Sequence, residues 1–98
     1  MAKYLTLWEM DTSKTPVDPK EQATLYGKQL EMVKKQLAEG LINDWGIFAG
    51  GGGGYAIGEG DATDVFKGVL PFSPYAKFKT QPVLSVDEVA EVMKSMMG

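Results

Sequence analysis

The chain has 98 residues, of which 44% are hydrophobic and 23% are charged, and its formal net charge is −3. This length suits one hydrophobic core, so we expect a single domain over residues 1–98 that is too apolar to be disordered. Thirteen acidic residues outnumber ten basic ones, and no basic cluster is present, which argues against nucleic acid as a partner. No apolar run reaches the ~18 residues of a membrane span, which argues against a membrane partner.

Three residue types are missing from the sequence. It contains no cysteine and no histidine, and all ten of its cations are lysines. The absence of cysteine excludes disulfides and thiolate metal sites. The chain also lacks histidine, the usual acid/base residue, and arginine, which usually binds carboxylates through two hydrogen bonds. We predict no metal and no cofactor. Because residues 1–4 run into a strand pattern without an apolar signal-peptide core, a cytoplasmic location is expected.

The first predicted element is a strand over residues 3–10, which alternates between two faces. Leu5 and Leu7 point to one face. The other face carries larger and more aromatic side chains, namely Tyr4, Thr6, Trp8 and Met10.

A long helix is predicted next, over residues 19–39. Asp18 is a good N-cap, Pro19 fits the first helical position, and Gly40 ends the helix. A strand over residues 42–49 follows, then five glycines (Gly50–Gly54) as a flexible turn, and then a strand over residues 55–59.

The C-terminal half repeats the pattern of helix and strand. Asp61 caps a helix over residues 62–70, and a strand over residues 75–84 follows it. Ser85 and Glu88 form a capping box for a last helix that is rich in valine and methionine.

The order βαββαβ, with a tight connection only between the second and third strands, predicts an α+β fold of the ferredoxin-like type with an extra C-terminal helix. Both main helices then lie on one face of an antiparallel sheet. If Leu5 and Leu7 face the helices, the row from Tyr4 to Met10 lies on the uncovered face. Large aromatic surfaces are rarely left to water, so we expect a homodimer or higher oligomer.

Two clusters of residues are candidate ligand-binding sites. The glycine run joins two strands, whereas phosphate-binding loops lead into a helix, so a hairpin tip is the favoured interpretation. Glu59, Asp61 and Asp64 form an acidic group, but helix capping and the helix dipole account for the two aspartates. The methionines of the last helix are interpreted as core or interface residues rather than metal ligands.

A pocket on the uncovered face is the remaining candidate site. It would be apolar with a few convergent polar groups, as small-molecule sites tend to be. The predicted ligand-binding residues are Tyr4, Trp8, Tyr55, Tyr75 and Lys77, with Glu59 beside them. The alternative is that these residues form a dimer interface and bind no ligand.

From Asp18 onward the chain resembles muconolactone isomerase and the small uncharacterised proteins related to it, within the dimeric α+β-barrel superfamily. The shared stretches are Asp18-Pro19-Lys20, Leu37-Ala38-Glu39-Gly40, Ile47-Phe48-Ala49-Gly50, Tyr55 and Leu70-Pro71-Phe72-Ser73-Pro74-Tyr75. The last stretch is the most specific, because it matches a Leu-Pro-Leu-Phe-Pro-Tyr segment that leads into the final strand.

The resemblance implies two sheets facing each other in a dimeric barrel. It also implies an enzyme that isomerises a small molecule by moving a proton, which requires a general base. One hypothesis for this chain is therefore a cofactor-independent isomerase, with Glu9 or Glu59 as the base and Tyr75 and Lys77 as electrostatic partners. The absence of histidine and arginine departs from that enzyme. The other hypothesis is a non-catalytic oligomeric module that binds a ligand or acts as a scaffold.

Overall fold

The structure, a computed structural model, describes residues 2–98. Its elements are β1 (Ala2–Met10), η1 (Thr12–Lys14), α1 (Pro19–Ala38), β2 (Asp44–Ile47), β3 (Gly53–Gly60), α2 (Ala62–Val69), η2 (Leu70–Phe72), β4 (Ala76–Val83) and α3 (Val86–Met96). The strands form one antiparallel sheet in the order β2-β3-β1-β4. This α+β arrangement is compatible with the ferredoxin-like fold and carries the extra C-terminal helix that the sequence predicts.

The helix ends follow the predicted capping chemistry. The Asp18 side chain accepts a hydrogen bond from the Lys20 amide at 3.3 Å, and α1 ends before Gly40, whose φ is +76°. At the start of α3, the Glu88 amide donates to Ser85 Oγ at 3.1 Å and the Ser85 amide donates to the Glu88 carboxylate at 2.9 Å. These bonds satisfy amides that the first turn of a helix leaves without partners.

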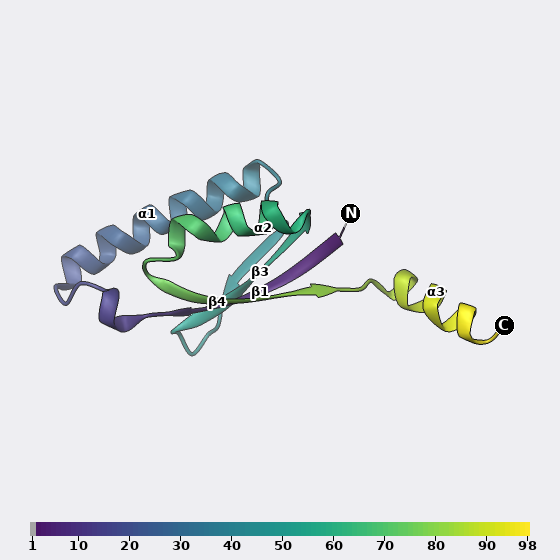
Figure 1. The fold of residues 1–98 in the computed structure, drawn as a ribbon. Coiled ribbons are helices and arrows are strands. Elements are labelled where there is room, and N and C mark those ends of the chain that lie inside the picture. Colours follow the sequence, from purple (N-terminus) through teal and green to yellow (C-terminus); the bar gives the residue numbers. More distant parts are fainter. Residues whose placement is uncertain (1) are drawn as a thin grey trace.

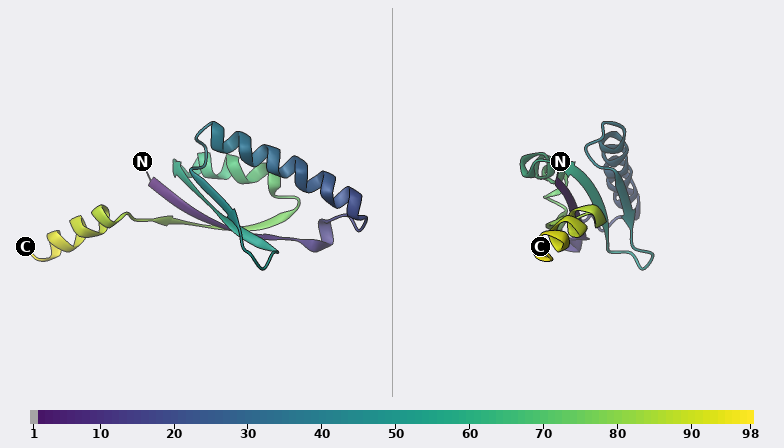
Figure 2. Two further views of the ribbon diagram at one scale, coloured as in Figure 1. Left: turned by 180° about the vertical axis from the view of Figure 1, so that it is seen from behind. Right: turned by 90° about the vertical axis from the view of Figure 1, so that its right-hand side faces the viewer.

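Helices α1 and α2 lie side by side over the same face of the sheet, and the opposite face is uncovered (Figures 1 and 2). The Gln36 side-chain amide of α1 donates to the Gly68 carbonyl of α2 at 3.0 Å, which ties the two helices together. The molecule therefore has one helix layer, one sheet layer and one open sheet face.

The strand register reverses the expected direction of the β1 side chains. Trp8 lies opposite Gly54 on β3 and Phe78 on β4, and the row of Tyr4, Thr6, Trp8 and Met10 faces the helices. The expectation that Leu5 and Leu7 face the helices is wrong, since by alternation they lie on the open face. The physical reason is space: a methyl group on Gly54 would lie 2.5 Å from Trp8 Cζ2, so only glycine lets the indole rest there.

The glycine run is divided between a turn and a strand. Strand β3 begins at Gly53 rather than Tyr55, and β2 is shorter than the predicted 42–49. Gly51 and Gly52 have φ values of +80° and +82°, a region that glycine enters without steric cost. The Met10 amide donates to the Gly52 carbonyl at 2.8 Å, so backbone hydrogen bonds tie the tip to β1.

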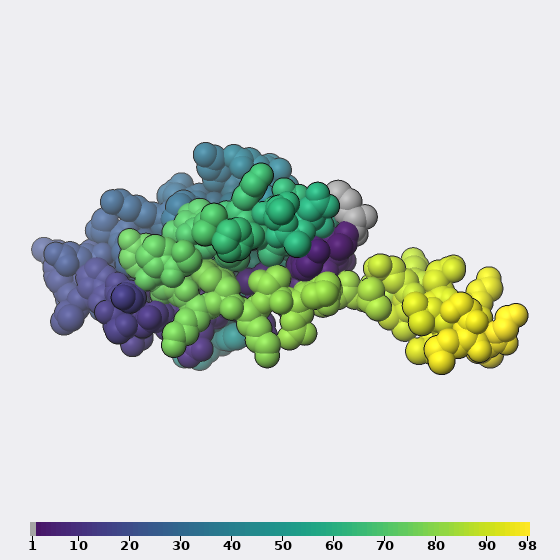
Figure 3. Space-filling model, in the orientation of Figure 1, coloured from purple at the N-terminus to yellow at the C-terminus, as the bar shows by residue number. Residues whose placement is uncertain are grey.

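Helix α3 stands apart from the rest of the molecule. It continues from the end of β4 and projects beyond the body, giving the chain extents of 62 × 26 × 21 Å (Figure 3). Among residues 2–98, no helix combines the length and apolar character needed to cross a membrane.

Candidate functional site

A cavity of about 510 Å³ lies between the helix layer and the sheet. Side chains from all four strands and from α1 and α2 line it, including Tyr4, Thr6, Trp8, Met10, Leu30, Val33, Trp45, Ala56, Val65, Val69 and Phe78. Ligand pockets in proteins typically range from about 300 to 1,000 Å³ and are mostly apolar. The size and lining of this cavity therefore suit a small organic molecule.

The cavity exists because the helix layer does not fill the space above the sheet. Among the described residues, Val33 of α1 is the one hydrophobic side chain that counts as buried, at 6% exposure, while Leu30 on the same helix is 45% exposed. Beneath them, β3 contributes Ala56 and Gly58 to the lining, and Gly54 lies on the same face of the strand. The absence of large side chains at these positions leaves room under the helices. A closely packed interior would have few voids of this size.

Two tryptophans stack in the wall of the cavity. The ring centroids of Trp8 and Trp45 are 5.6 Å apart, with an angle of 13° between the ring planes. Trp8 belongs to β1 and Trp45 to β2, and β3 runs between these strands. The indoles meet because their partners on β3 are Gly54 and Ala56, which are too small to separate them.

Some of the polar side chains that line the cavity already have hydrogen-bond partners. Thr6, 6% exposed, shares a hydrogen bond of 3.0 Å between its hydroxyl and that of Thr80. The Asp64 carboxylate accepts a hydrogen bond from the Asp61 amide at 3.1 Å. Among residues 2–98, Trp8 Nε1 is the one fully buried side-chain nitrogen or oxygen without a hydrogen-bond partner. An unpaired buried donor costs about 1–3 kcal/mol. This nitrogen has almost no accessible surface, so the cavity does not present it directly to a ligand.

The open face of the sheet holds the other titratable candidates. Glu9 lies directly opposite Lys77, and Glu59 directly opposite Lys3. Tyr55 sits over Gly46, where a methyl group would lie 2.5 Å from its ring, and its hydroxyl donates to Asp44 at 2.9 Å. This hydrogen bond to a carboxylate holds the pKa of Tyr55 above its ordinary value.

The structure does not bring the predicted site residues together. Tyr4 and Trp8 line the cavity, whereas Tyr55 and Lys77 belong to the open face. Tyr75 lies in the turn before β4, where its carbonyl accepts a hydrogen bond from the Asp11 amide at 2.9 Å. The proposed bases, Glu9 and Glu59, also lie on the open-face side of their strands, away from the tryptophan pair.

Sequence reasoning missed Trp45, Val33 and Val69 as site residues. One sequence feature could have indicated the cavity: large side chains alternate along the first strand, and small residues alternate along the third, at Gly54, Ala56 and Gly58. This feature becomes informative only when the register of the two strands is known.

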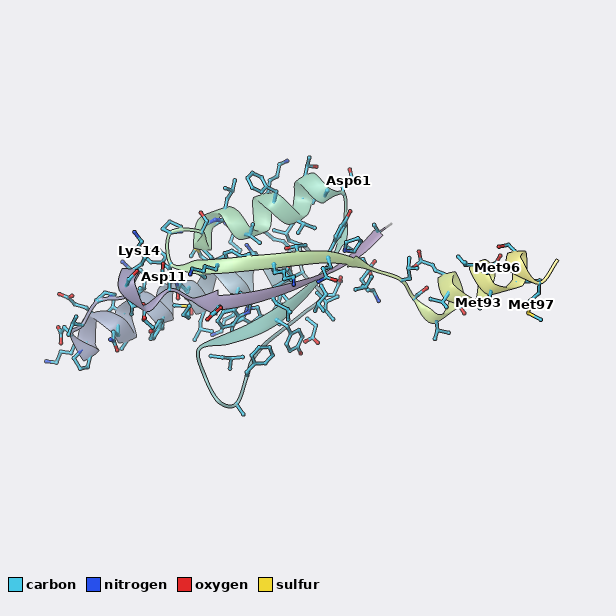
Figure 4. The ribbon with its side chains drawn as sticks, turned by 60° about the horizontal axis from the view of Figure 1, so that its bottom comes forward. Asp11, Lys14, Asp61, Met93, Met96 and Met97 are labelled. Carbon is cyan, nitrogen blue, oxygen red and sulfur yellow. The ribbon has the colours of Figure 1, made fainter. Side chains whose placement is uncertain are left out.

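The acidic residues near the cavity are held by structural hydrogen bonds. Hydrogen bonds from the Ser13 hydroxyl at 2.6 Å and the Ser13 amide at 3.1 Å hold the pKa of Asp11 below its usual value. Asp11 and Lys14 lie together at η1, away from Asp61 at the start of α2 (Figure 4). Within residues 2–98, no three histidine, cysteine, aspartate or glutamate side chains gather closely enough to hold a metal ion.

Residues 2–97 match a family described as a domain of unknown function, DUF3303. The match covers nearly the whole chain, and the chain belongs to this family. No curated protein matches the sequence significantly.

Proposed function

We propose that this member of the DUF3303 family binds a small, planar, largely apolar molecule in the cavity between the sheet and helices α1 and α2. The observation that carries the proposal is the stacked pair of Trp8 and Trp45 in the wall of an apolar cavity. Flat aromatic surfaces pair well with other flat rings in offset or edge-to-face arrangements. The lining also includes hydroxyl and amide donors, at Tyr4, Tyr26 and Gln29, which favour a ligand with a hydrogen-bond acceptor.

Binding without catalysis fits the cavity better than isomerisation. A general base must lie within hydrogen-bond reach of the proton that it removes. Among the described residues, Asp64 is the one carboxylate that lines the cavity, and it already caps the first turn of α2. An isomerase-like activity would therefore have to use Asp64, because Glu9 and Glu59 lie on the open-face side of their strands.

Coumarin is a suitable probe, because it is planar and apolar and carries a carbonyl acceptor. Naphthalene matches its size but lacks the acceptor. We expect saturable binding of coumarin by calorimetry and by the fluorescence of the protein's two tryptophans, and weaker binding of naphthalene. The absence of saturable coumarin binding up to its solubility limit would contradict the proposal.

A pair of variants on β3 tests the location. Ala56→Leu enlarges a side chain that lines the cavity, so it should weaken coumarin binding at least tenfold. Ile57→Leu is the matched control, because Ile57 is the next residue of the strand and points to the open face. Circular dichroism checks that both variants fold. Equal affinity for the two variants would place the ligand elsewhere.

The charges on the open face support a homodimer built by two facing sheets, as in a dimeric α+β barrel. Leu5, Leu7, Tyr55 and Ile57 form its apolar centre, and Leu7 is 40% exposed. The β4 side carries Lys77 and Lys79, whereas the β2–β3 side carries Asp44 and Glu59. A two-fold axis parallel to the strands sets the basic side of one copy over the acidic side of the other, and an axis perpendicular to the strands sets lysines over lysines. Charge complementarity therefore favours the first arrangement.

A further inference from the structure

Helix α3 has no packing partner in the chain that the structure describes. Every residue from Val86 to Gly98 is exposed, and Met96 retains 77% of its surface exposure. Met93, Met96 and Met97 lie on the part of the helix farthest from the sheet (Figure 4). Isolated helices shorter than about 12–15 residues are marginal in water, so an 11-residue helix of this kind needs a surface to pack against.

The apolar residues of α3 follow a coiled-coil spacing. Val86, Val89, Met93 and Met96 are separated by three, four and three residues, which places them at the a and d positions of a heptad. The flanking e and g positions are also apolar, at Ala90, Val92 and Met97. All the charged residues fall on the opposite side, at positions b, c and f: Asp87, Glu88, Glu91 and Lys94.

We propose that α3 packs against α3 of a second copy of this chain. The stripe is self-complementary, and pairing it leaves the acidic side chains of both helices on the outside, where they do not repel across the seam. The proposal builds on the homodimer above. A two-fold axis parallel to the strands sends both α3 helices out of the same end of the dimer and in the same direction, from opposite edges of the facing sheets. This parallel direction is the one that heptad pairing uses.

The position of α3 favours this partner over the chain's own body. A short link after β4 carries α3 outward, so the helix is separated from the sheet and from helices α1 and α2 (Figures 1 and 3). The radius of gyration is 16.3 Å, whereas a compact chain of this length is expected near 13 Å. A second copy brings an identical stripe to the same end of the assembly without bending β4.

Single cysteines can test the pairing, because the natural chain has none. Val89→Cys places a thiol at a d position, where the two helices of the pair would bring the sulfurs within disulfide range. Ser95→Cys, on the outer side of the same helix, is the matched control. Under mild oxidation at micromolar concentration, we expect the Val89→Cys protein to form a covalent dimer at least tenfold faster than the Ser95→Cys protein. Equal rates, or no cross-link in either protein, would overturn the pairing.

A second variant separates failure of the α3 pair from failure of the facing sheets. Leu7→Lys alters the open sheet face and leaves α3 unchanged. Rapid cross-linking of Val89→Cys in the Leu7→Lys background would support the α3 pair even if the facing sheets proved wrong. Two results together would overturn the α3 pair and leave the facing sheets in place. Leu7→Lys would dissociate the dimer that the wild-type protein forms, and Val89→Cys would cross-link no faster than Ser95→Cys.

Discussion

The indole rings of Trp8 and Trp45 stack with their centroids 5.6 Å apart, although they come from strands that are not neighbours in the sheet. The residues between them are Gly54 and Ala56 of β3. A large pair above two small residues forms a flat aromatic wall for the cavity under the helices. Much of the proposed function depends on this arrangement.

Gly54→Ala tests the space beneath the tryptophan pair. The added methyl group would clash with the Gly46 carbonyl oxygen of β2 and would lie 2.5 Å from Trp8 Cζ2, so both the neighbouring strand and the indole must move. Overpacking of this kind costs about 1–3 kcal/mol of unfolding free energy. Chemical denaturation measures the loss, and tryptophan fluorescence reports the displaced stack. Gly50→Ala is the control, because nothing lies within 4 Å of its added methyl group; comparable losses in both variants would rule out the close contact.

Asp44→Asn should lower the pKa of Tyr55. The hydrogen bond to the Asp44 carboxylate favours the protonated phenol, which raises the pKa above the ordinary 10.0. The stabilisation from this bond is therefore fully present below pH 10 and is lost as the pH rises through the raised value. Carbon NMR of the tyrosine Cζ atoms can follow the titration. An unchanged Tyr55 pKa in the variant would show that the carboxylate does not cause the shift.

Leu7→Lys should shift the protein from dimer to monomer. Leu7 lies at the centre of the apolar open face, opposite Tyr55 and Lys79, so the substitution adds an unpaired charge to the proposed seam. Sedimentation at micromolar concentration compares the variant with wild type. Val17→Lys is a useful control, since Val17 is 91% exposed and precedes α1, outside the sheet. A wild-type protein that sediments as a monomer across this range would contradict the homodimer.

Asp18→Ala removes the N-cap of the long helix. The Asp18 carboxylate accepts a hydrogen bond from the Lys20 amide at 3.3 Å, and loss of such a cap costs on the order of 1 kcal/mol. The denaturant midpoint should fall while the circular dichroism of the folded state stays unchanged. An unaltered midpoint would show that another group satisfies the first turn of α1.

The elements themselves were predictable from local chemistry. Asp18, Gly40 and the Ser85–Glu88 pair mark helix ends through bonds that depend only on neighbouring residues. The α+β class and the order of the elements follow from these ends and from the alternation of the strands. Local signals of this kind survive folding because tertiary contacts do not oppose them.

The direction of the strand faces was not predictable. Both sides of β1 are apolar enough to face a core, so alternation alone does not choose between Leu5 and Leu7 on one side and Trp8 on the other. The choice depends on which residue of β3 lies opposite Trp8, and a shift of one residue would replace Gly54 with Tyr55. For this reason the predicted pocket combined residues from opposite faces, and Trp45 was missed.

The most direct test of the binding proposal is a methyl-selective NMR titration of the full-length protein with coumarin. We predict saturable shifts at Val33, Val65 and Val69, which line the cavity, and none at Leu5 or Ile57 on the open face. Saturable shifts confined to Leu5 and Ile57, or no saturable shifts at any methyl group, would contradict a binding site between the sheet and the helices.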